Sequence, residues 1–126
     1  MTWRNQKTPE GYVKHAVIEY LAAERIFYLR TNSGTQLIQN PETGKTRKLQ
    51  MAPPGTADIL ALPSRWLGTF HWIQPLWIET KAAGKKQSPA QIEFERDRIA
   101  EGHAYIVSHS IDDVAEWLHN FRRYKP

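Results

Sequence analysis

A carboxylate and a lysine lie two residues apart at the end of a short apolar segment. Glu79 and Lys81 flank Thr80, directly after residues 76–78. In a β-strand, side chains two residues apart point to the same face, so this carboxylate and ammonium group would leave the strand together. Open α/β sheets place their binding sites at the carboxyl ends of their strands. The pattern indicates either such a site or an ordinary ion pair on a solvated surface.

Asp58 interrupts another apolar segment, residues 57–62. Aspartate is depleted in strands, and an unpaired buried charge costs much free energy. One interpretation is a turn cap at the bend formed by residues 55–56. The other is a metal ligand that faces Glu79 from the adjacent strand, because a divalent cation removes the repulsion between two neighbouring carboxylates.

Glu10 lies in the first turn of a predicted helix over residues 9–23. Thr8 and Pro9 are typical of a helix start. Val17 follows on the same face, which we expect to turn toward the sheet. Glu10 is therefore either a first-turn carboxylate that the helix dipole favours or a third carboxylate that reaches the metal, directly or through water.

Gln91 stands three residues after Ser88, at the start of a second predicted helix over residues 88–101. There it completes a capping box, but it also lies near the mouth of the strand that carries Glu79 and can position water or substrate. Helical spacing leads us to expect one apolar stripe of this helix, beside Gln91, to face inward: Ile92, Arg96 and Ile99. Phe94 then falls on the opposite, exposed face, where it suggests a dimer or substrate contact.

Several other kinds of site are excluded. The segment at Gly84 lacks the first glycine of a P-loop, because position 79 is glutamate. There is no G-x-G-x-x-G and no G-x-S-x-G motif. The five histidines have no metal-binding spacing, and the absence of cysteine removes thiol nucleophiles and cysteine-bound zinc.

The apolar periodicity, turn residues and caps predict an α/β domain with a mixed sheet of about four strands and helices on both faces. A βαβ crossover runs from the Glu79 strand through the second helix. The expected elements are a helix over 9–23, a strand over 26–30, a hairpin or irregular loop over 36–50, a strand over 57–62, a turn over 64–69, a strand over 70–81 that Pro75 interrupts, a helix over 88–101, a strand over 104–107 and a helix over 110–121.

The composition suits one globular domain. The chain has 126 residues, of which 40% are hydrophobic and 24% charged, which excludes disordered and collagen-like structure. Its net charge of +4 suits a polyanionic partner. There is no apolar run long enough to span a membrane and no signal-peptide pattern. We expect a cytoplasmic protein with a loose tail over residues 1–7 and a basic tail over 122–126.

Taken together, Asp58, the Glu79–Lys81 triplet and Gln91 resemble the PD-(D/E)XK nuclease superfamily. Within it, the chain looks most like the small stand-alone VRR-NUC proteins of phages and prophages, and more distantly like the archaeal Holliday-junction resolvases. The likeness spans about residues 9–118. Its matching segments are residues 10–21, 30–34, 55–60, 76–81 and 88–91.

The chain departs from the family pattern in three places. Ala57 stands where the family has its name-giving proline, and residues 107–109 read Val-Ser-His instead of Val-Arg-Arg. The aromatic stretch over residues 66–72 is longer than a tight hairpin needs. It is a dimer arm, a substrate wedge or an extended hairpin.

The resemblance implies a restriction-endonuclease-like core and Mg²⁺- or Mn²⁺-dependent hydrolysis of DNA phosphodiester bonds. Structure-selective cleavage of branched DNA, such as four-way junctions or flaps, and a homodimer are also implied. The metal ligands would be Asp58, Glu79 and the Thr80 carbonyl, with Glu10 as a direct or outer-shell fourth. Lys81 would orient the attacking water or neutralise the phosphate, and Gln91 would position water or substrate.

Basic and polar residues in the loops are candidates for contacts to the phosphate backbone, which position a substrate without reading its sequence. They are Arg30, Asn32, Ser33, Lys45, Arg47, Lys48, Lys85 and Lys86. Two alternative functions stay open. One is a DNA-binding module without catalysis, which needs neither Asp58 nor Lys81. The other is a restriction-type nuclease or an exonuclease that acts on duplex DNA.

Overall fold

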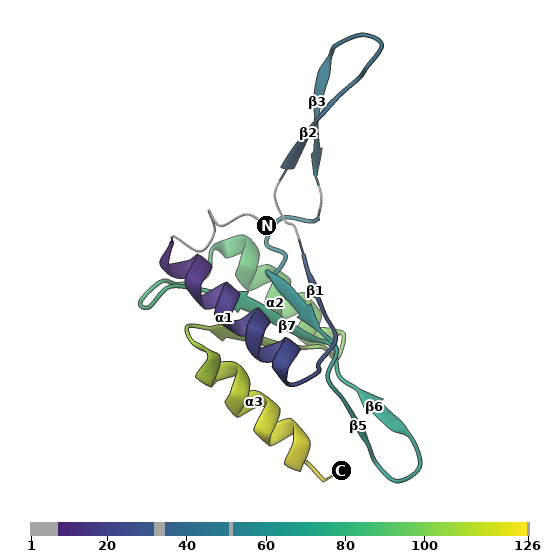
Figure 1. Cartoon of the computed structure of the whole chain (residues 1–126), viewed down its shortest axis with the longest axis vertical. Helices are drawn as coiled ribbons and strands as arrows, with labels where there is room; N and C mark the ends of the chain where they lie inside the picture. Colours follow the sequence, from purple (N-terminus) through teal and green to yellow (C-terminus); the bar gives the residue numbers. More distant parts are fainter. Residues whose placement is uncertain (1–7, 32–34, 51, 126) are drawn as a thin grey trace.

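The computed structural model describes residues 8–31, 35–50 and 52–125, and it confirms the predicted α/β class (Figure 1). The residues of the predicted 1–7 tail lie outside this part of the chain. Within it, no helix is both long enough and apolar enough to cross a membrane. The elements are α1 (Pro9–Ala23), β1 (Tyr28–Arg30), β2 (Thr35–Gln39), β3 (Thr46–Gln50), β4 (Ile59–Ala61), β5 (Ser64–Trp66), β6 (His71–Ile73), β7 (Leu76–Thr80), α2 (Pro89–Ala100), β8 (Ala104–Ser108) and α3 (Ile111–Arg123).

A mixed four-stranded sheet forms the centre of the molecule, in the order β1-β4-β7-β8. β4 pairs with β1 and β7 in antiparallel fashion, and β7 pairs with β8 in parallel. The chain passes from β7 to β8 through α2, so the predicted βαβ crossover is confirmed. The pairing of Ile59 with Ile78 sets the register between β4 and β7.

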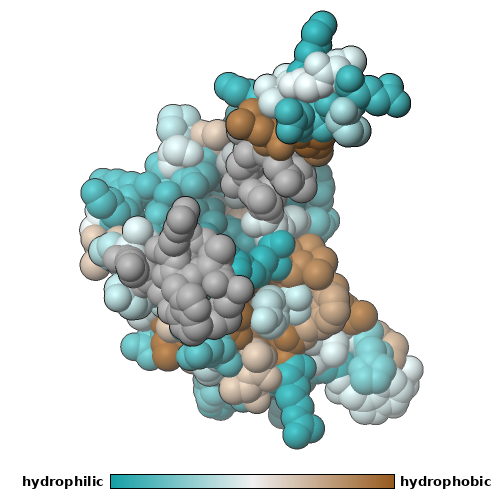
Figure 2. All heavy atoms as spheres, turned by 45° about the horizontal axis from the view of Figure 1, so that its top comes forward, coloured by the Kyte–Doolittle hydropathy of each residue, from teal (hydrophilic) through white to brown (hydrophobic). Residues whose placement is uncertain are grey.

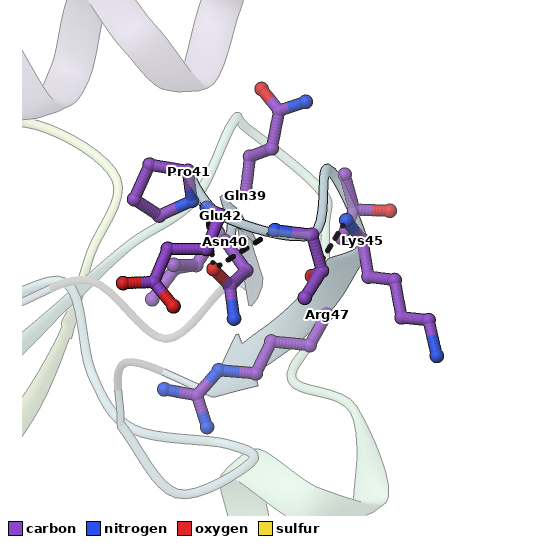
Figure 3. Close-up of a pocket in the computed structure, with 9 residues that line it drawn as sticks. Gln39, Asn40, Pro41, Glu42, Lys45 and Arg47 are labelled. Atoms are coloured by element: carbon purple, nitrogen blue, oxygen red, sulfur yellow. Dashed lines mark hydrogen bonds between the residues drawn. The ribbon is translucent and has the colours of Figure 1, made fainter.

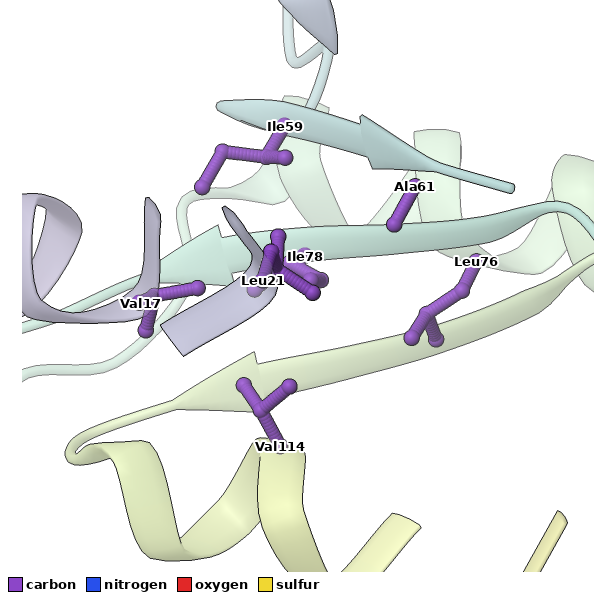
Figure 4. Close-up of a cluster of buried hydrophobic side chains, with 7 residues drawn as sticks. All are labelled: Val17, Leu21, Ile59, Ala61, Leu76, Ile78 and Val114. Atoms are coloured by element: carbon purple, nitrogen blue, oxygen red, sulfur yellow. The ribbon is translucent and has the colours of Figure 1, made fainter. Parts of the chain in front are cut away.

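Helices cover both faces of this sheet, as predicted. On one face, α1 and α3 pack against apolar side chains of β4 and β7 (Figure 4). All members of this cluster are buried, and they come from four different elements. They are Val17, Leu21, Ile59, Ala61, Leu76, Ile78 and Val114.

On the other face, α2 is oriented differently from the prediction. Phe94, expected to be exposed, is only 8% exposed, and its ring meets Trp77 edge to face at 5.0 Å. Ile92 and Ile99, expected to face inward, are 54% and 52% exposed. The reason is the aromatic surface that Trp77 and Tyr105 present, which offers a phenylalanine ring better contacts than it offers a branched aliphatic side chain.

Two separate hairpins extend from the core (Figure 1). The segment over 36–50 was left open between a hairpin and an irregular loop, and it is a hairpin of β2 and β3. The expected turn over 64–69 is wrong at its start, because β5 is a strand that pairs with β6. Here cross-strand pairing and packing against α3 outweigh the local turn residues.

Contacts with α3 hold the β5–β6 hairpin. Trp72 lies 4.8 Å from the Phe121 ring and 5.6 Å from the Tyr124 ring, between centroids. Arg65, its cross-strand neighbour, donates hydrogen bonds to the backbone carbonyls of Phe121 and Tyr124. These bonds satisfy acceptors at the end of α3, which continues to Arg123 and so includes the start of the predicted basic tail.

Candidate metal centre

The three predicted carboxylates converge at one end of the sheet. Glu10 comes from the first turn of α1, Asp58 directly precedes β4, and Glu79 lies in β7. One carboxylate oxygen of each lies within 4.8 Å of the others. Divalent cations bind oxygen ligands at about 2.1–2.5 Å and retain water, so such a group can hold one cation. The sequence prediction that these side chains lie together is confirmed.

Strand register brings Asp58 opposite Glu79. Ile59 pairs with Ile78, and one further step along the antiparallel pair joins the two carboxylate residues. The backbone around Asp58 is also held from its other side, because the Thr31 N–H donates to the Asp58 carbonyl at 2.9 Å. The Thr31 hydroxyl donates to the carbonyl of Ala57. The position of the Asp58 side chain therefore follows from the pairing of three strands.

The Asp58 carboxylate accepts bonds from two directions. Its Oδ2 accepts from the backbone N–H of Thr80 at 2.9 Å and from the Thr80 hydroxyl at 2.8 Å. Its Oδ1 lies 3.3 Å from Lys14 Nζ. These partners belong to β7 and α1, so the alternative of a cap for the bend at residues 55–56 is wrong. Thr80 lies beside the cluster as predicted, and its carbonyl as a metal ligand stays a prediction.

Lys14 was missed by the sequence analysis. It lies one helical turn after Glu10, and its side chain is 23% exposed. Residues four apart on a helix share a face, so the position of Glu10 carried the signal that could have found Lys14. Lys14 balances part of the negative charge of the cluster and fixes the Asp58 carboxylate.

Glu79 is the most unusual group of the cluster. Its side chain is 2% exposed; Oε1 accepts from Gln91 Nε2 at 3.2 Å and lies 4.0 Å from Lys81 Nζ. Oε2 is buried and has no hydrogen-bond donor among the described residues. Burial, and then the Asp58 carboxylate, raise the pKa of Glu79 to about 8, while Lys81 acts in the opposite direction. A buried carboxylate oxygen without a donor is costly, and a bound cation would supply the missing partner.

Gln91 takes part in the predicted capping box and also contacts the carboxylate cluster, while its role in positioning water or substrate stays a prediction. Its Oε1 accepts from the backbone N–H of Ser88 at 2.8 Å, which completes the predicted capping box. Its Nε2 donates to Glu79 Oε1. One amide thus links the start of α2 to the carboxylate cluster, so the orientation of the helix and of Glu79 are coupled.

Gly55 fixes the approach of α2 to the loop before Asp58. It has a φ of +81°, and a Cβ atom there would collide with the carbonyl group of Ala90. Only glycine combines this backbone conformation with such close packing. The contact places the first turn of α2, including Gln91, against the site.

Lys81 completes the predicted set. Its side chain is 14% exposed, and its backbone N–H donates to the Ser108 carbonyl at 2.9 Å, which continues the pairing of β7 with β8. Lys14 and Lys81 therefore flank the three carboxylates with two ammonium groups. The site joins a cluster of carboxylates that can hold a cation to positive charge that can face an anionic substrate.

The predicted phosphate contacts fall into three groups. Arg30 is exposed at the end of β1, next to Thr31, and Lys85 and Lys86 are exposed in the loop between β7 and α2. Asn32 and Ser33 lie outside the described residues. The remaining cations belong to the β2–β3 hairpin: Lys45, Arg47 and Lys48.

Comparisons with known proteins find no matching family model, and no significant match among curated proteins or solved structures. The resemblance to the PD-(D/E)XK nucleases therefore stays a prediction that depends on the residues described above.

Proposed function

We propose that the protein is a Mg²⁺- or Mn²⁺-dependent nuclease. The observation that carries this proposal is the buried, unpartnered Oε2 of Glu79 within a group of three carboxylates. In ordinary ion-pair networks most buried polar atoms have a hydrogen-bond partner, so a buried carboxylate oxygen without one is unusual. Carboxylate oxygens are the ligands that Mg²⁺ and Mn²⁺ prefer.

Glu10, Asp58 and Glu79 would hold the cation. When bound, it would supply a water of lowered pKa and stabilise negative charge on a phosphoryl group. The chain contributes orientation: Thr80 and Lys14 fix the Asp58 carboxylate, and Gln91 fixes Glu79.

Lys81 is the residue that we assign to the substrate. Among the described residues, its ammonium group has a single ion-pair partner, Glu79, and that contact is long, at 4.0 Å to Oε1. It is therefore free to orient the attacking water or to neutralise charge on the phosphate as the transition state forms. Its partial burial makes this charge more effective than it would be in open solvent.

The proposed substrate is DNA. The net charge of +4 favours a polyanion, and Arg30, Lys85 and Lys86 place exposed cations on segments that adjoin the site. We further propose branched DNA as the preferred form and a homodimer as the active assembly, both on the resemblance alone.

The test uses end-labelled single-stranded, duplex, flap and four-way-junction DNA, each with Mg²⁺, Mn²⁺ or EDTA. We expect metal-dependent cleavage that Lys81→Ala abolishes while the protein still folds and binds DNA. Lys125→Ala, an exposed lysine remote in sequence from the site, is the matched control and should cut normally. If Lys81→Ala cut as fast as the wild type, the assignment of the site would be wrong.

Other results would favour the alternatives. Tight, salt-sensitive binding by both proteins with no cleavage in any metal would indicate a non-catalytic binding module. Discrete fragments from plasmid DNA would indicate a restriction-type nuclease. Mononucleotide products from duplex ends would indicate an exonuclease.

A further inference from the structure

The β2–β3 hairpin projects away from the layered core (Figure 1). Each of its strands has five residues, paired from Thr35 with Gln50 to Gln39 with Thr46. Strands of this length extend roughly 17 Å. The outer end of the hairpin is therefore a long way from the sheet.

The core does little to cover this hairpin. Every side chain over residues 37–49 is exposed except that of Ile38, which is partly buried. Leu37 is 67% exposed and Leu49 39% exposed. An isolated two-stranded hairpin is only marginally stable in water. Packing within the chain therefore does not account for the exposed side chains of the hairpin, whereas contact with a partner molecule would.

The hairpin is strongly basic. Over residues 35–50 it carries Lys45, Arg47 and Lys48 against the single carboxylate of Glu42. Its charge of +2 is half of the net charge of the chain. Within the described residues, none of the three cations forms an ion pair. Unpaired, exposed lysine and arginine side chains are the groups that bind the phosphates of a nucleic acid.

The positive charge is available on both faces of the hairpin. Arg47 lies across from Ile38 and Lys48 across from Leu37, and neighbouring residues of a strand point to opposite faces. Lys45 adds a third cation where the turn meets β3. Figure 2 shows hydrophilic side chains over the outer end and hydrophobic ones nearer the core.

The turn at the outer end is well ordered by its own hydrogen bonds. Asn40 Oδ1 accepts from the backbone N–H of Glu42 at 2.9 Å, and the Asn40 carbonyl accepts from Gly44 N–H at 2.8 Å. A hollow of about 730 Å³ lies against this turn, and Lys45 and Arg47 border it and extend in different directions (Figure 3). The cations are thus carried by a defined structure.

The base of the hairpin is tied to the proposed site. Thr31, which follows β1, donates its backbone N–H to the carbonyl of Asp58. The chain leaves the sheet after Thr31 and returns to it at Asp58, so the segment that contains the hairpin starts and ends beside a proposed metal ligand. A molecule bound along the hairpin would run toward the carboxylates.

We propose that the β2–β3 hairpin is an arm that lies along the phosphate backbone of a nucleic-acid duplex on one side of the scissile bond. At about 3.4 Å per base pair, its length covers about five base pairs. A duplex is favoured over a single strand because a two-stranded ribbon fits a groove of duplex DNA and its rigid backbone holds phosphates within reach of both faces. The position relative to the scissile bond rests on the proposed nuclease function.

The experiment measures binding without cleavage, in EDTA, by fluorescence anisotropy on the full chain. The arm variant combines Lys45→Gln, Arg47→Gln and Lys48→Gln. The control combines Arg25→Gln, Arg96→Gln and Lys125→Gln, which remove the same charge from other exposed positions. Thermal melting of each protein checks that it is folded.

On a duplex of about 20 base pairs, we expect the arm variant to bind about 10- to 100-fold more weakly than the wild type. Its dependence of log affinity on log salt should be shallower by about 3, since each lost phosphate contact removes about 0.9. On a single strand of about 20 nucleotides, which offers no groove for the ribbon, the loss should be under about threefold. The control should stay close to the wild type on both.

Equal losses in the arm variant and the control would overturn the proposal, because general charge would then explain the binding. Equal losses on the duplex and on the single strand would overturn the assignment of a duplex arm. If the wild type cuts DNA but the arm variant binds normally, only the arm is wrong. If the arm variant loses affinity while the wild type never cuts with any metal, the arm stands and the nuclease function fails.

Discussion

At one end of the β4–β7 pair, three carboxylates lie within 4.8 Å of one another; at the other end, Trp72 packs between Phe121 and Tyr124. Like charges at the first end repel, and Glu79 is buried there with one oxygen unpartnered. Aromatic rings at the second end remove apolar surface from water and meet at favourable angles. The first arrangement lowers the stability of the fold, whereas the second raises it.

This difference indicates that the residues that stabilise the fold are not the ones that would carry the proposed function. Groups that destabilise a fold persist where a function needs them. Substitutions of the carboxylates should therefore remove the proposed cleavage activity without loss of stability, and substitutions of the aromatic rings should do the reverse. Four predictions test the separation.

The largest effect is expected from Glu79→Gln. Loss of a ligand should lower metal-dependent cleavage by about a thousandfold or more, equivalent to several kcal/mol of transition-state stabilisation. In EDTA above about pH 8, where Glu79 is ionised in the wild type, the variant should be the more stable protein, because its neutral amide no longer repels Asp58. Initial rates and thermal melting measure the two effects. A lower melting temperature under those conditions would contradict the comparison.

Trp72→Ala should show the opposite pattern. We expect a loss of about 3 kcal/mol in the free energy of unfolding, the lower end for tryptophan truncation, because Trp72 is only partly buried. Cleavage per folded molecule should be unchanged. Trp66→Ala, in the same hairpin but 57% exposed, is the control and should cost less than about 1 kcal/mol. Urea denaturation of both variants provides the numbers.

A smaller loss of stability is expected when a glycine is replaced by alanine, either near the carboxylates (Gly55) or in the β5–β6 hairpin (Gly68). Gly55 and Gly68 both have positive φ, but a Cβ at Gly55 would strike the Ala90 carbonyl, and none of the described atoms lies within 4 Å of one at Gly68. Gly68→Ala should cost about 1 kcal/mol from its backbone conformation alone. Gly55→Ala should cost about 1 kcal/mol more and also slow cleavage, because α2 must shift. Equal costs would mean that the close approach of α2 has no energetic consequence.

The last prediction concerns how the free energy of unfolding depends on pH in the absence of metal. Glu79 has its ordinary pKa of 4.5 in the unfolded chain and one of about 8 in the folded protein. Between these values the folded state holds the extra proton, so its contribution to stability is full below about pH 4.5 and is lost as pH rises toward 8. The slope should be no more than about 1.4 kcal/mol per pH unit.

Urea denaturation in EDTA between pH 5 and 8 measures this slope, and the difference from Glu79→Gln isolates the contribution of Glu79. Saturating Mg²⁺ should reverse the trend, because the cation binds the ionised carboxylate. A slope of the same size in Glu79→Gln would assign the effect to another group.

The sequence predicted those features that depend on local chemistry. The capping residues Thr8 and Ser88 and the prolines after them placed the starts of α1 and α2 correctly. The convergence of Asp58 and Glu79 was also predictable. Each lies at the end of an apolar strand, and pairing of the two strands brings the two carboxylates together. Mixed topology followed from the length of the β7-to-β8 connection.

Features that depend on partners far along the chain were not predicted. The inward face of α2 was wrong because Ile92 and Ile99 outnumber Phe94, and periodicity contains no information about the aromatic surface opposite. β5 was missed because its stability comes from contacts with α3, about 55 residues later. Lys14 was overlooked because its partner, Asp58, is also far along the chain, directly before β4.

The hydrogen bond between the Thr31 N–H and the Asp58 carbonyl has a consequence for how this chain can change over time. This bond joins the two ends of the segment that contains the β2–β3 hairpin, so the register of β1 and β4 does not depend on the length or sequence of that segment. Doubling the length of a flexible closed loop costs only about 0.6 kcal/mol. Insertions, deletions or grafted sequences can therefore remodel the hairpin while the carboxylates stay in place, which makes residues 35–50 a natural position for diversification and for engineering.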